Sequence, residues 1–256
     1  MSNLIVGGSS GLGKEIAYEF AKKSKDIVLI SRDIKDLDIL KSDIQIKYNI
    51  DVKIFQLDFS KPEDVIKFIS ENHELLEKLD GALFPIGMMI ENDTIENSEK
   101  NFLSLLSANF YCVGLFISNI IKIFKKRNNG FIVGFGSISG SIGRDANIAY
   151  SCAKSALENF FEGLIISNLK NNIKIQFYTL GYLDTNLSSG KKLLLPKGSP
   201  KKLAEIVFKN LNKKSLKNYY PGWWTIIDFI IKMIPFFISK NIIKHFKKNK
   251  NQKILI

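Results

Sequence analysis

Short apolar runs alternate along the chain with longer stretches in which apolar residues recur at helical spacing. The short runs are rich in Ile, Val and Phe, which is typical of strands buried on both faces of a parallel sheet. We expect strands at Leu4–Val6, Ile27–Ile30, Lys53–Leu57, Ala82–Ile86, Phe131–Phe135, Ile173–Thr179 and Lys217–Tyr220. We expect helices at Leu12–Lys23, Pro62–Glu77, Ser98–Lys126, Ile148–Asn171 and Pro200–Asn212. This alternation predicts an α/β fold, a single doubly wound domain whose parallel sheet is flanked by helices.

The net charge of +12 is distributed very unevenly over the 256 residues. Through Asn186 there are 21 Lys and Arg against 23 Asp and Glu, a net charge of −2. From Leu187 onward 16 Lys stand against only Glu205 and Asp228, a net charge of +14. The body of the protein is therefore near neutral, and the basic surface belongs to the last quarter of the chain.

The compartment can be inferred from the first residues and from the cysteines. The chain begins with a strand-like run rather than with a secretory signal, which favours a cytoplasmic protein. Cys112 and Cys152 lie at apolar helical positions, and we expect both to be reduced packing residues rather than a disulfide.

A glycine-rich turn joins the first expected strand to the first helix. It reads Gly7-Gly8-Ser9-Ser10-Gly11-Leu12-Gly13. Glycines allow a tight turn and a close approach of the backbone to phosphate oxygens at the N-terminus of a helix. A glycine pattern alone also occurs in ordinary loops, but its position directly after the first strand favours a Rossmann-type dinucleotide site.

The end of the second strand bears on the choice of coenzyme. Ser31 and Arg32 offer a hydroxyl and a guanidinium, which favour the 2′-phosphate of NADP(H) over the free ribose hydroxyl of NAD(H). Asp33 keeps the NAD(H) alternative open, although an N-cap of the next helix is the interpretation we favour. Asp58, after the third strand, is either an acceptor for the adenine amino group or part of a turn with Ser60.

Three residues in the second half of the chain suggest carbonyl chemistry. Tyr150 and Lys154 lie four residues apart and therefore share one helix face, so that an ammonium can lower the pKa of a phenol. Ser137, thirteen residues before Tyr150, can bring a second hydroxyl to the same carbonyl oxygen. Together with the glycine turn, this set predicts hydride transfer between a nicotinamide and a carbonyl or alcohol.

These residues, in this order and spacing, resemble the short-chain dehydrogenase/reductase family over residues 3–220. The resemblance implies that Tyr150 donates the proton, that Lys154 holds the ribose hydroxyls and stabilises the phenolate, and that Ser137 orients the carbonyl. It implies that Asn109 anchors a water next to Lys154. It also implies coenzyme contacts from the glycine turn and from Asp58, Gly87, Gly181 and Thr185; we assign no residue to a metal.

The chain departs from the family pattern after the fourth strand. The family usually has an Asn-Ala-Gly turn there, whereas this chain has Phe84-Pro85-Ile86-Gly87, of which only Gly87 carries over. Leu180 likewise replaces the usual Pro before Gly181. Neither change removes a group that transfers a proton.

We expect the domain to span residues 1–220, with a substrate lid at about 186–200. We expect residues 221–256 to form a basic amphipathic helical tail. In this tail Thr225, Asp228 and Lys232 form a narrow polar stripe among apolar residues, and lysines interleave with Phe and Ile after Pro235. This pattern favours peripheral contact with the inner face of the membrane. The alternative is that the tail packs on the body or on a sister subunit, since we expect a homo-oligomer. Nucleic acid is not an expected partner, because these lysines lie beside aliphatic residues.

Within the family, the tail, the turn at Phe84–Gly87 and the Phe160–Leu164 segment resemble the decaprenylphosphoryl-2-keto-pentofuranose reductase branch. That resemblance implies an NADPH-dependent reductase of a keto-sugar, free or lipid-linked, in cell-envelope glycan synthesis. Two alternatives stay open: a soluble enzyme for nucleotide sugars or 3-oxoacyl thioesters, and a non-catalytic NADP-binding interaction protein.

Overall fold

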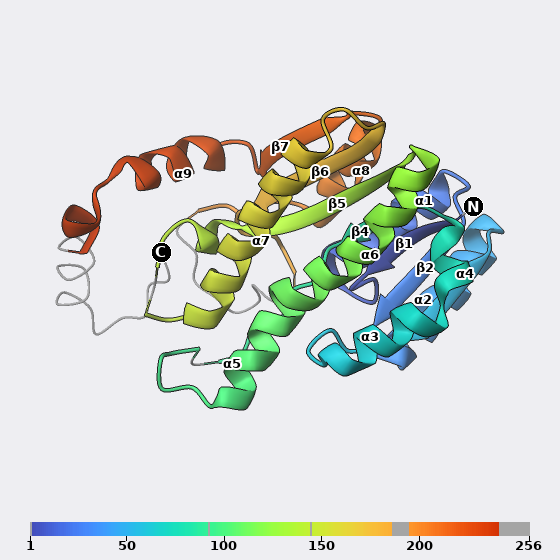
Figure 1. Cartoon of the computed structure of the whole chain (residues 1–256), viewed down its shortest axis with the longest axis horizontal. Coiled ribbons are helices and arrows are strands. Elements are labelled where there is room, and N and C mark those ends of the chain that lie inside the picture. Colours follow the sequence, from blue (N-terminus) through green and yellow to red (C-terminus); the bar gives the residue numbers. More distant parts are fainter. Residues whose placement is uncertain (1, 92, 144, 186–194, 241–256) are drawn as a thin grey trace.

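The computed structural model describes residues 2–91, 93–143, 145–185 and 195–240 (Figure 1). Its centre is an all-parallel sheet with strand order β3-β2-β1-β4-β5-β6-β7. The strands are β1 Ser2–Val6, β2 Ile27–Ser31, β3 Val52–Gln56, β4 Leu79–Phe84, β5 Gly130–Ser137, β6 Ile173–Leu180 and β7 Ser215–Tyr220. The chain builds outward from β1 to β3 and then, from β4, in the opposite direction to β7. The order therefore reverses between β1 and β4, and in such sheets ligands bind beyond the carboxyl ends of the strands at that point.

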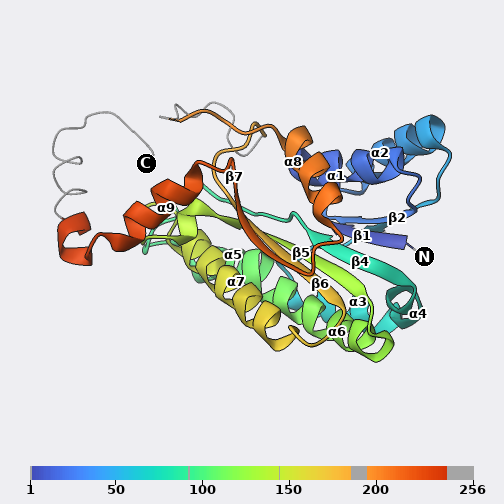
Figure 2. The same cartoon turned by 90° about the horizontal axis from the view of Figure 1, so that it is seen from above.

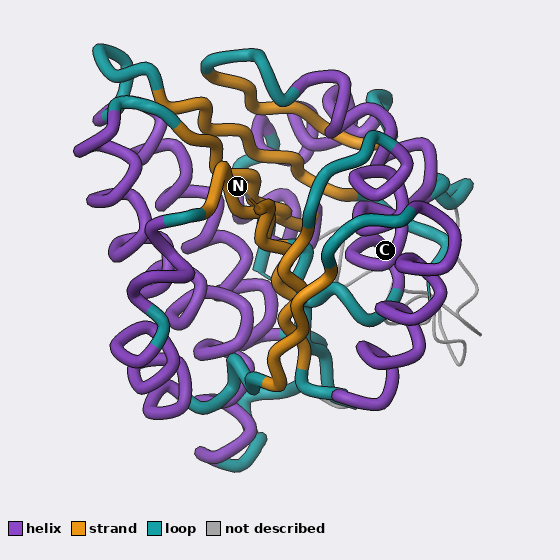
Figure 3. The backbone as a smooth tube through the Cα atoms, turned by 90° about the vertical axis from the view of Figure 1, so that its right-hand side faces the viewer, coloured by secondary structure: helices purple, strands orange, loops and turns teal. Residues whose placement is uncertain are grey.

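Helices cover both faces of the sheet, as the views in Figures 2 and 3 show. One layer holds α1 (Gly11–Lys22), α2 (Ile34–Tyr48) and α8 (Pro200–Asn210). The other layer holds α3 (Pro62–Glu71), α4 (His73–Glu77), α5 (Glu99–Leu106), α6 (Cys112–Arg127) and α7 (Ile148–Ser167). Each layer encloses its own apolar core, around Ile16 and Phe20 on the first face and around Phe116 and Phe161 on the second. The predicted doubly wound α/β fold is confirmed.

The helices differ from the predicted ranges at several points. The expected helix Pro62–Glu77 is divided at Asn72, and the helix at Ser98–Lys126 contains a π-helical turn, Ser107–Tyr111. The helix α2 had been anticipated only through its N-cap.

Cys112 is buried as predicted, but Cys152 is exposed on α7, so the prediction that both cysteines are packing residues was wrong for Cys152.

After β7 the chain passes through a cis peptide bond between Tyr220 and Pro221 and forms α9, Trp224–Met233. Figure 1 shows α9 extending from the end of β7, on the opposite side of the molecule from the N-terminus. Among the described residues one helical run, Glu99–Arg127, is long and apolar enough to cross a membrane, and 56% of its most apolar window is buried inside the protein. The first part of the expected lid, residues 186–194, and the tail beyond residue 240 lie outside the described residues.

Candidate active site

A cavity of about 620 Å³ opens at the carboxyl ends of the strands, where the strand order reverses. The glycine turn, the ends of β2 and β3, the loop after β4, and α7 all contribute to its wall. The sequence-predicted residues that line it are Gly7, Ser9, Ser10, Gly11, Leu12, Ser31, Arg32, Asp58, Gly87, Tyr150, Lys154 and Thr185. Residues from positions 7 to 185 are thus brought together by the fold alone.

The glycine turn has a conformation that side chains would not tolerate. Gly7 and Gly11 have positive φ angles of 88° and 51°. Gly13 lies in the first turn of α1, where an added Cβ would come within 2.0 Å of the Gly7 carbonyl oxygen. Ser10 is the N-cap residue of α1, but its side chain makes no capping hydrogen bond. The N-cap side chain therefore does not occupy the backbone N–H groups at the N-terminus of α1, which borders the cavity. Such a helix N-terminus suits the phosphates of a dinucleotide.

The second strand ends beside this turn. The hydroxyls of Ser9 and Ser31 lie 2.7 Å apart, which joins the glycine turn to the end of β2. Arg32 is exposed and lines the cavity, and its carbonyl oxygen accepts a hydrogen bond from Gln56 at 3.0 Å. Asp33 caps α2, because its Oδ1 accepts hydrogen bonds from the backbone N–H groups of Lys35 and Asp36. Asp33 therefore has the capping role that the sequence favoured.

Asp58 forms a turn with Ser60 and also lies at the cavity, the two positions that the sequence analysis gave as alternatives. Its Oδ1 accepts hydrogen bonds from the backbone N–H of Ser60 at 2.9 Å and from the Ser60 hydroxyl at 2.8 Å. This is the turn interpretation. Asp58 also lines the cavity, so the same turn holds its carboxylate at the edge of the site.

Tyr150 and Lys154 lie in the first two turns of α7, on the face that borders the cavity. The Lys154 ammonium nitrogen is 5.9 Å from the centre of the Tyr150 ring. It donates hydrogen bonds to the carbonyl oxygens of Ile86 at 3.1 Å and Phe135 at 3.3 Å. These two carbonyls come from the loop after β4 and from the end of β5, so the ammonium is held between this loop, a strand and a helix.

Burial is the dominant influence on Lys154. The residue is only 3% exposed, and removal from water lowers the pKa of its ammonium group from 10.5 to about 8. The lysine is therefore mostly charged at neutral pH and loses its proton readily above it.

Asn109 lies in the π-helical turn Ser107–Tyr111 and is fully buried. Its side-chain amide pairs with the backbone of Met88 in both directions: Oδ1 accepts from the N–H at 3.0 Å, and Nδ2 donates to the carbonyl at 2.9 Å. Nδ2 also donates to the carbonyl of Leu105 at 2.9 Å. Turns of this kind are frequent at functional sites. Asn109 does not line the cavity itself but fixes the loop that supplies the Ile86 carbonyl to Lys154.

Three further predicted residues are not among the described residues that line this cavity. They are Ser137, Gly13 and Gly181. Ser137 ends β5, and its hydroxyl accepts a hydrogen bond from the Ser139 N–H at 3.1 Å. Gly13 acts through helix packing. At Gly181 an added Cβ would lie 1.7 Å from the indole nitrogen of Trp224, so this glycine makes room for α9. The prediction that Gly181 contacts the coenzyme therefore has no support from the cavity geometry.

Asp93 is a residue of the site that the sequence interpretation missed. Its side chain is buried, and its carboxylate accepts hydrogen bonds from the backbone N–H groups of Ala149 at 3.1 Å and Tyr150 at 2.9 Å. Its carbonyl oxygen accepts from the N–H of Ile148 at 3.0 Å. The loop after β4 thus caps the helix that carries Tyr150 and Lys154. No local signal could have found it, because 55 residues separate Asp93 from the start of α7.

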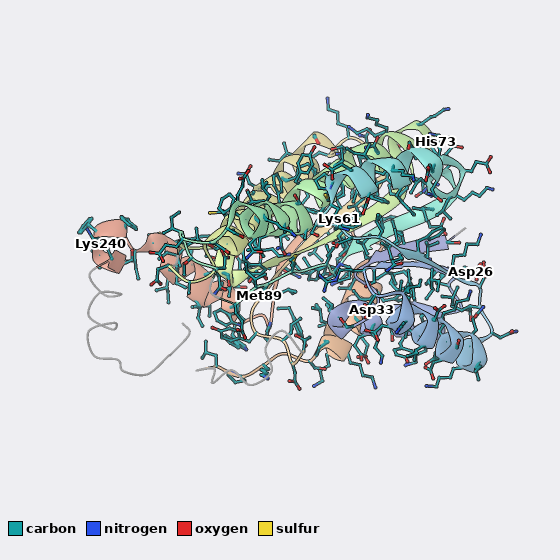
Figure 4. The ribbon with its side chains drawn as sticks, turned by 90° about the horizontal axis from the view of Figure 1, so that it is seen from below. Asp26, Asp33, Lys61, His73, Met89 and Lys240 are labelled. Carbon is teal, nitrogen blue, oxygen red and sulfur yellow. The ribbon has the colours of Figure 1, made fainter. Side chains whose placement is uncertain are left out.

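The labelled side chains of Figure 4 locate the site along the molecule. Asp33 and Met89 are both cavity residues and lie in the middle of the view, whereas Asp26 and His73 lie at the opposite end of the sheet.

Comparisons with known proteins agree with this geometry. The sequence matches the family model described as short chain dehydrogenase over residues 3–193. It is 25% identical over 237 residues to a very-long-chain 3-oxoacyl-CoA reductase of Podospora anserina, covering 87% of this chain and 67% of the relative. It is 29% identical over 241 residues to 11-beta-hydroxysteroid dehydrogenase-like 2 of Arabidopsis thaliana, covering 90% and 76%.

A solved short-chain dehydrogenase from Sphingobium yanoikuyae, in complex with NADPH, has the same fold, with a TM-score of 0.77 at 19% identity over 100% of this chain and 98% of that one. The chain spans about two thirds of the length of the fungal reductases that it matches. From the family match over most of its length and the shared fold, the chain belongs to the short chain dehydrogenase family, oxidoreductases that act on CH–OH and C=O groups.

Proposed function

We propose that the protein is an NADPH-dependent carbonyl reductase in which Tyr150 is the proton donor and Lys154 is its electrostatic partner. The observation that carries this proposal is the buried ammonium of Lys154, held 5.9 Å from the Tyr150 ring at the wall of a cavity that begins with a glycine turn. A positive charge in that position favours the phenolate form of the tyrosine and therefore lowers the cost of giving up its proton.

Each of the site residues has a separate role in the proposed reaction. The bound nicotinamide would supply or accept a hydride. The Tyr150 hydroxyl donates its proton to the substrate oxygen as that oxygen gains negative charge, and Lys154 stabilises the phenolate that remains. Ser137 orients the same substrate oxygen. Asn109 and Asp93 hold the loop and the helix that set this geometry, and the family resemblance adds a water anchored by Asn109.

The coenzyme that we propose is NADP(H). Arg32 is exposed at the end of β2, and Asp33 beside it is engaged as the cap of α2. A 2′-phosphate at this point would meet a guanidinium, which binds phosphate in a bidentate manner. The expected result of Arg32→Ala is a loss of NADPH affinity much larger than the loss of NADH affinity, measured by fluorescence titration. Equal losses for both coenzymes would contradict this assignment.

The cavity wall near the reacting groups favours a substrate with apolar parts. Met88, Met89, Ile90 and Leu183 line it together with Tyr150. We propose a ketone or secondary alcohol on an amphiphilic molecule, such as a keto-sugar linked to a lipid. A 3-oxoacyl thioester is the second candidate, since several relatives are named as very-long-chain 3-oxoacyl-CoA reductases. We propose a cytoplasmic homo-oligomer whose tail contacts the membrane peripherally.

The test of the catalytic assignment is Tyr150→Phe, with Tyr111→Phe as the matched control, because Tyr111 is exposed on the π-helical turn. NADPH oxidation with a panel of ketones and 3-oxoacyl thioesters should fall by about 10³-fold or more in Tyr150→Phe, since proton transfer contributes on that scale. NADPH binding should persist in both variants. Unchanged turnover in Tyr150→Phe would refute the role of the phenol, and the substrate that the wild type turns over with the highest kcat/KM distinguishes the two substrate classes.

A further inference from the structure

The helix α9 has a largely apolar face outward and directs its two charged residues toward the body, which is the reverse of an ordinary surface helix. Its polar residues at 228 and 232 are spaced by one helical turn and face the body of the protein. Its outward residues are 52 to 76% exposed, together with those of the short helical turn at 236–240. The outward residues are Ile226, Phe229, Ile230, Met233, Phe236 and Phe237.

The inward face is fixed to the body by buried charges. Asp228 is 1% exposed, accepts a hydrogen bond from the Tyr219 hydroxyl of β7, and forms an ion pair with Lys232 at 2.8 Å. Lys232 in turn reaches Glu158 of α7 at 3.4 Å, and Lys217 of β7 lies 2.8 Å from the same carboxylate. A partly buried network of this kind is disrupted if any of its members turns outward. The rotation of α9 that exposes the apolar side is therefore fixed by the fold.

Aromatic packing fixes the start of the same helix. Trp224 is buried over Gly181 and meets the Tyr182 ring edge-on at 5.5 Å. Gly181 and Tyr182 directly follow β6 and are next in the chain to the cavity residues Leu180 and Leu183. The start of α9 thus lies at the carboxyl edge of the sheet, close to residues that line the cavity.

The charge of the chain from Pro221 onward is almost entirely of one sign. From Pro221 to the end of the chain there are seven Lys and a single acid, Asp228, whose carboxylate is buried against Lys232. Figure 4 shows Lys240 at the outer end of the segment, beyond α9. The 16 residues that follow Lys240 contain five more Lys, six apolar residues and no acid. A second copy of the chain would bring two such cationic segments together, which is unfavourable, whereas a bilayer of anionic lipid supplies the opposite charge.

We propose that the outward face of α9 docks on an anionic phospholipid surface and thereby presents the carboxyl edge of the sheet, with its cavity, to the bilayer. This proposal deepens the membrane contact proposed above and rests on it. It names the residues that enter the interface and the side of the enzyme that faces the lipid. A substrate embedded in the bilayer would then meet the cavity without leaving the surface.

Vesicle binding of the full-length protein tests this proposal. The only two tryptophans, Trp223 and Trp224, are next to each other at the start of α9, so intrinsic fluorescence reports directly on this region. Wild-type protein should co-sediment with vesicles that contain phosphatidylglycerol, with a blue shift of its emission, and should bind far more weakly to vesicles of pure phosphatidylcholine. Ile226→Glu and Phe229→Glu should each lower the partition coefficient by about tenfold or more, because an exposed apolar contact is replaced by a charge.

The matched control is Ile46→Glu on α2, which makes the same change at a residue that is 85% exposed on another face. It should bind like the wild type. Wild-type-like binding by the α9 variants, or equal binding to neutral vesicles, would overturn the proposal. A wild-type oligomer that dissociates in the α9 variants without lipid would assign the face to a second copy instead. Turnover of a water-soluble ketone should survive in all three variants, so a failure of docking is distinguishable from a failure of the proposed catalysis.

Discussion

Lys154→Met should make the protein more stable at neutral pH and catalytically inactive. Methionine keeps an unbranched side chain of similar length but carries no charge. The pKa of Lys154 falls from 10.5 to about 8 on folding, so burial of the charged form costs about 3 kcal/mol at pH 7. The variant loses two hydrogen bonds to the carbonyls of Ile86 and Phe135, which together contribute about 2 kcal/mol. The net gain in the free energy of unfolding at pH 7 is therefore about 1 kcal/mol.

The dependence on pH distinguishes this reasoning from a simple packing effect. Between the folded and unfolded pKa values of Lys154, the unfolded chain binds more protons than the folded protein, so the stability of the wild type rises with pH through this range. The variant lacks that contribution. The difference between wild type and variant should thus shift by about 3 kcal/mol in favour of the wild type between pH 7 and pH 10.5, and its sign should reverse.

Urea denaturation of both proteins at several pH values in this range measures the difference, because titrations shared by the two chains cancel. Lys22→Met, at an exposed lysine in the last turn of α1, controls for the loss of a lysine as such. A difference that stays constant across the range, or that favours the variant increasingly as the pH rises, would refute the account of a buried ammonium. Loss of turnover without loss of stability at neutral pH would identify Lys154 as a residue kept for function at a cost in stability.

Other consequences of the site geometry can be measured on single variants. Gly13→Ala should destabilise the protein and abolish dinucleotide binding, because its Cβ would lie 2.0 Å from a backbone oxygen; Gly163→Ala in α7, where no atom lies within 4 Å, should instead be neutral or stabilising. Asp93→Ala should lower the free energy of unfolding by about 1 to 2 kcal/mol and reduce kcat more than it raises KM, since it uncaps α7. Asp93→Asn should restore part of both losses through its remaining carbonyl oxygen; an Asp93→Ala enzyme with wild-type kcat would show that the cap serves stability alone.

The sequence predicted the sheet and the glycine turn because both rest on local patterns. Strands buried on both faces leave continuous apolar runs such as Ile27–Ile30, and a turn with positive φ needs glycines such as Gly7. The sequence could not predict which way α9 would turn. Its polar stripe was visible, but an ordinary amphipathic helix directs such a stripe to water. Here Asp228 and Lys232 face inward because Tyr219 of β7 and Glu158 of α7 bind them. The packing of Gly181 against Trp224 was hidden for the same reason, since Trp224 reaches it from a distant part of the chain.

The loop after β4 shows how the site can keep its geometry without the family's usual Asn-Ala-Gly turn. Its contacts are made mainly through backbone atoms, which any residue supplies. The carbonyl of Ile86 accepts the hydrogen bond from Lys154, and both backbone groups of Met88 pair with Asn109. At the far end of the loop, Asp93 binds the first turn of α7. This one loop therefore binds Lys154 directly, caps the helix α7, and is itself held in place by Asn109. Only Asn109 and Asp93 need a particular side chain for these contacts. Substitutions at Ile86 that preserve its size should accordingly leave catalysis intact, whereas substitutions at Asn109 should impair it.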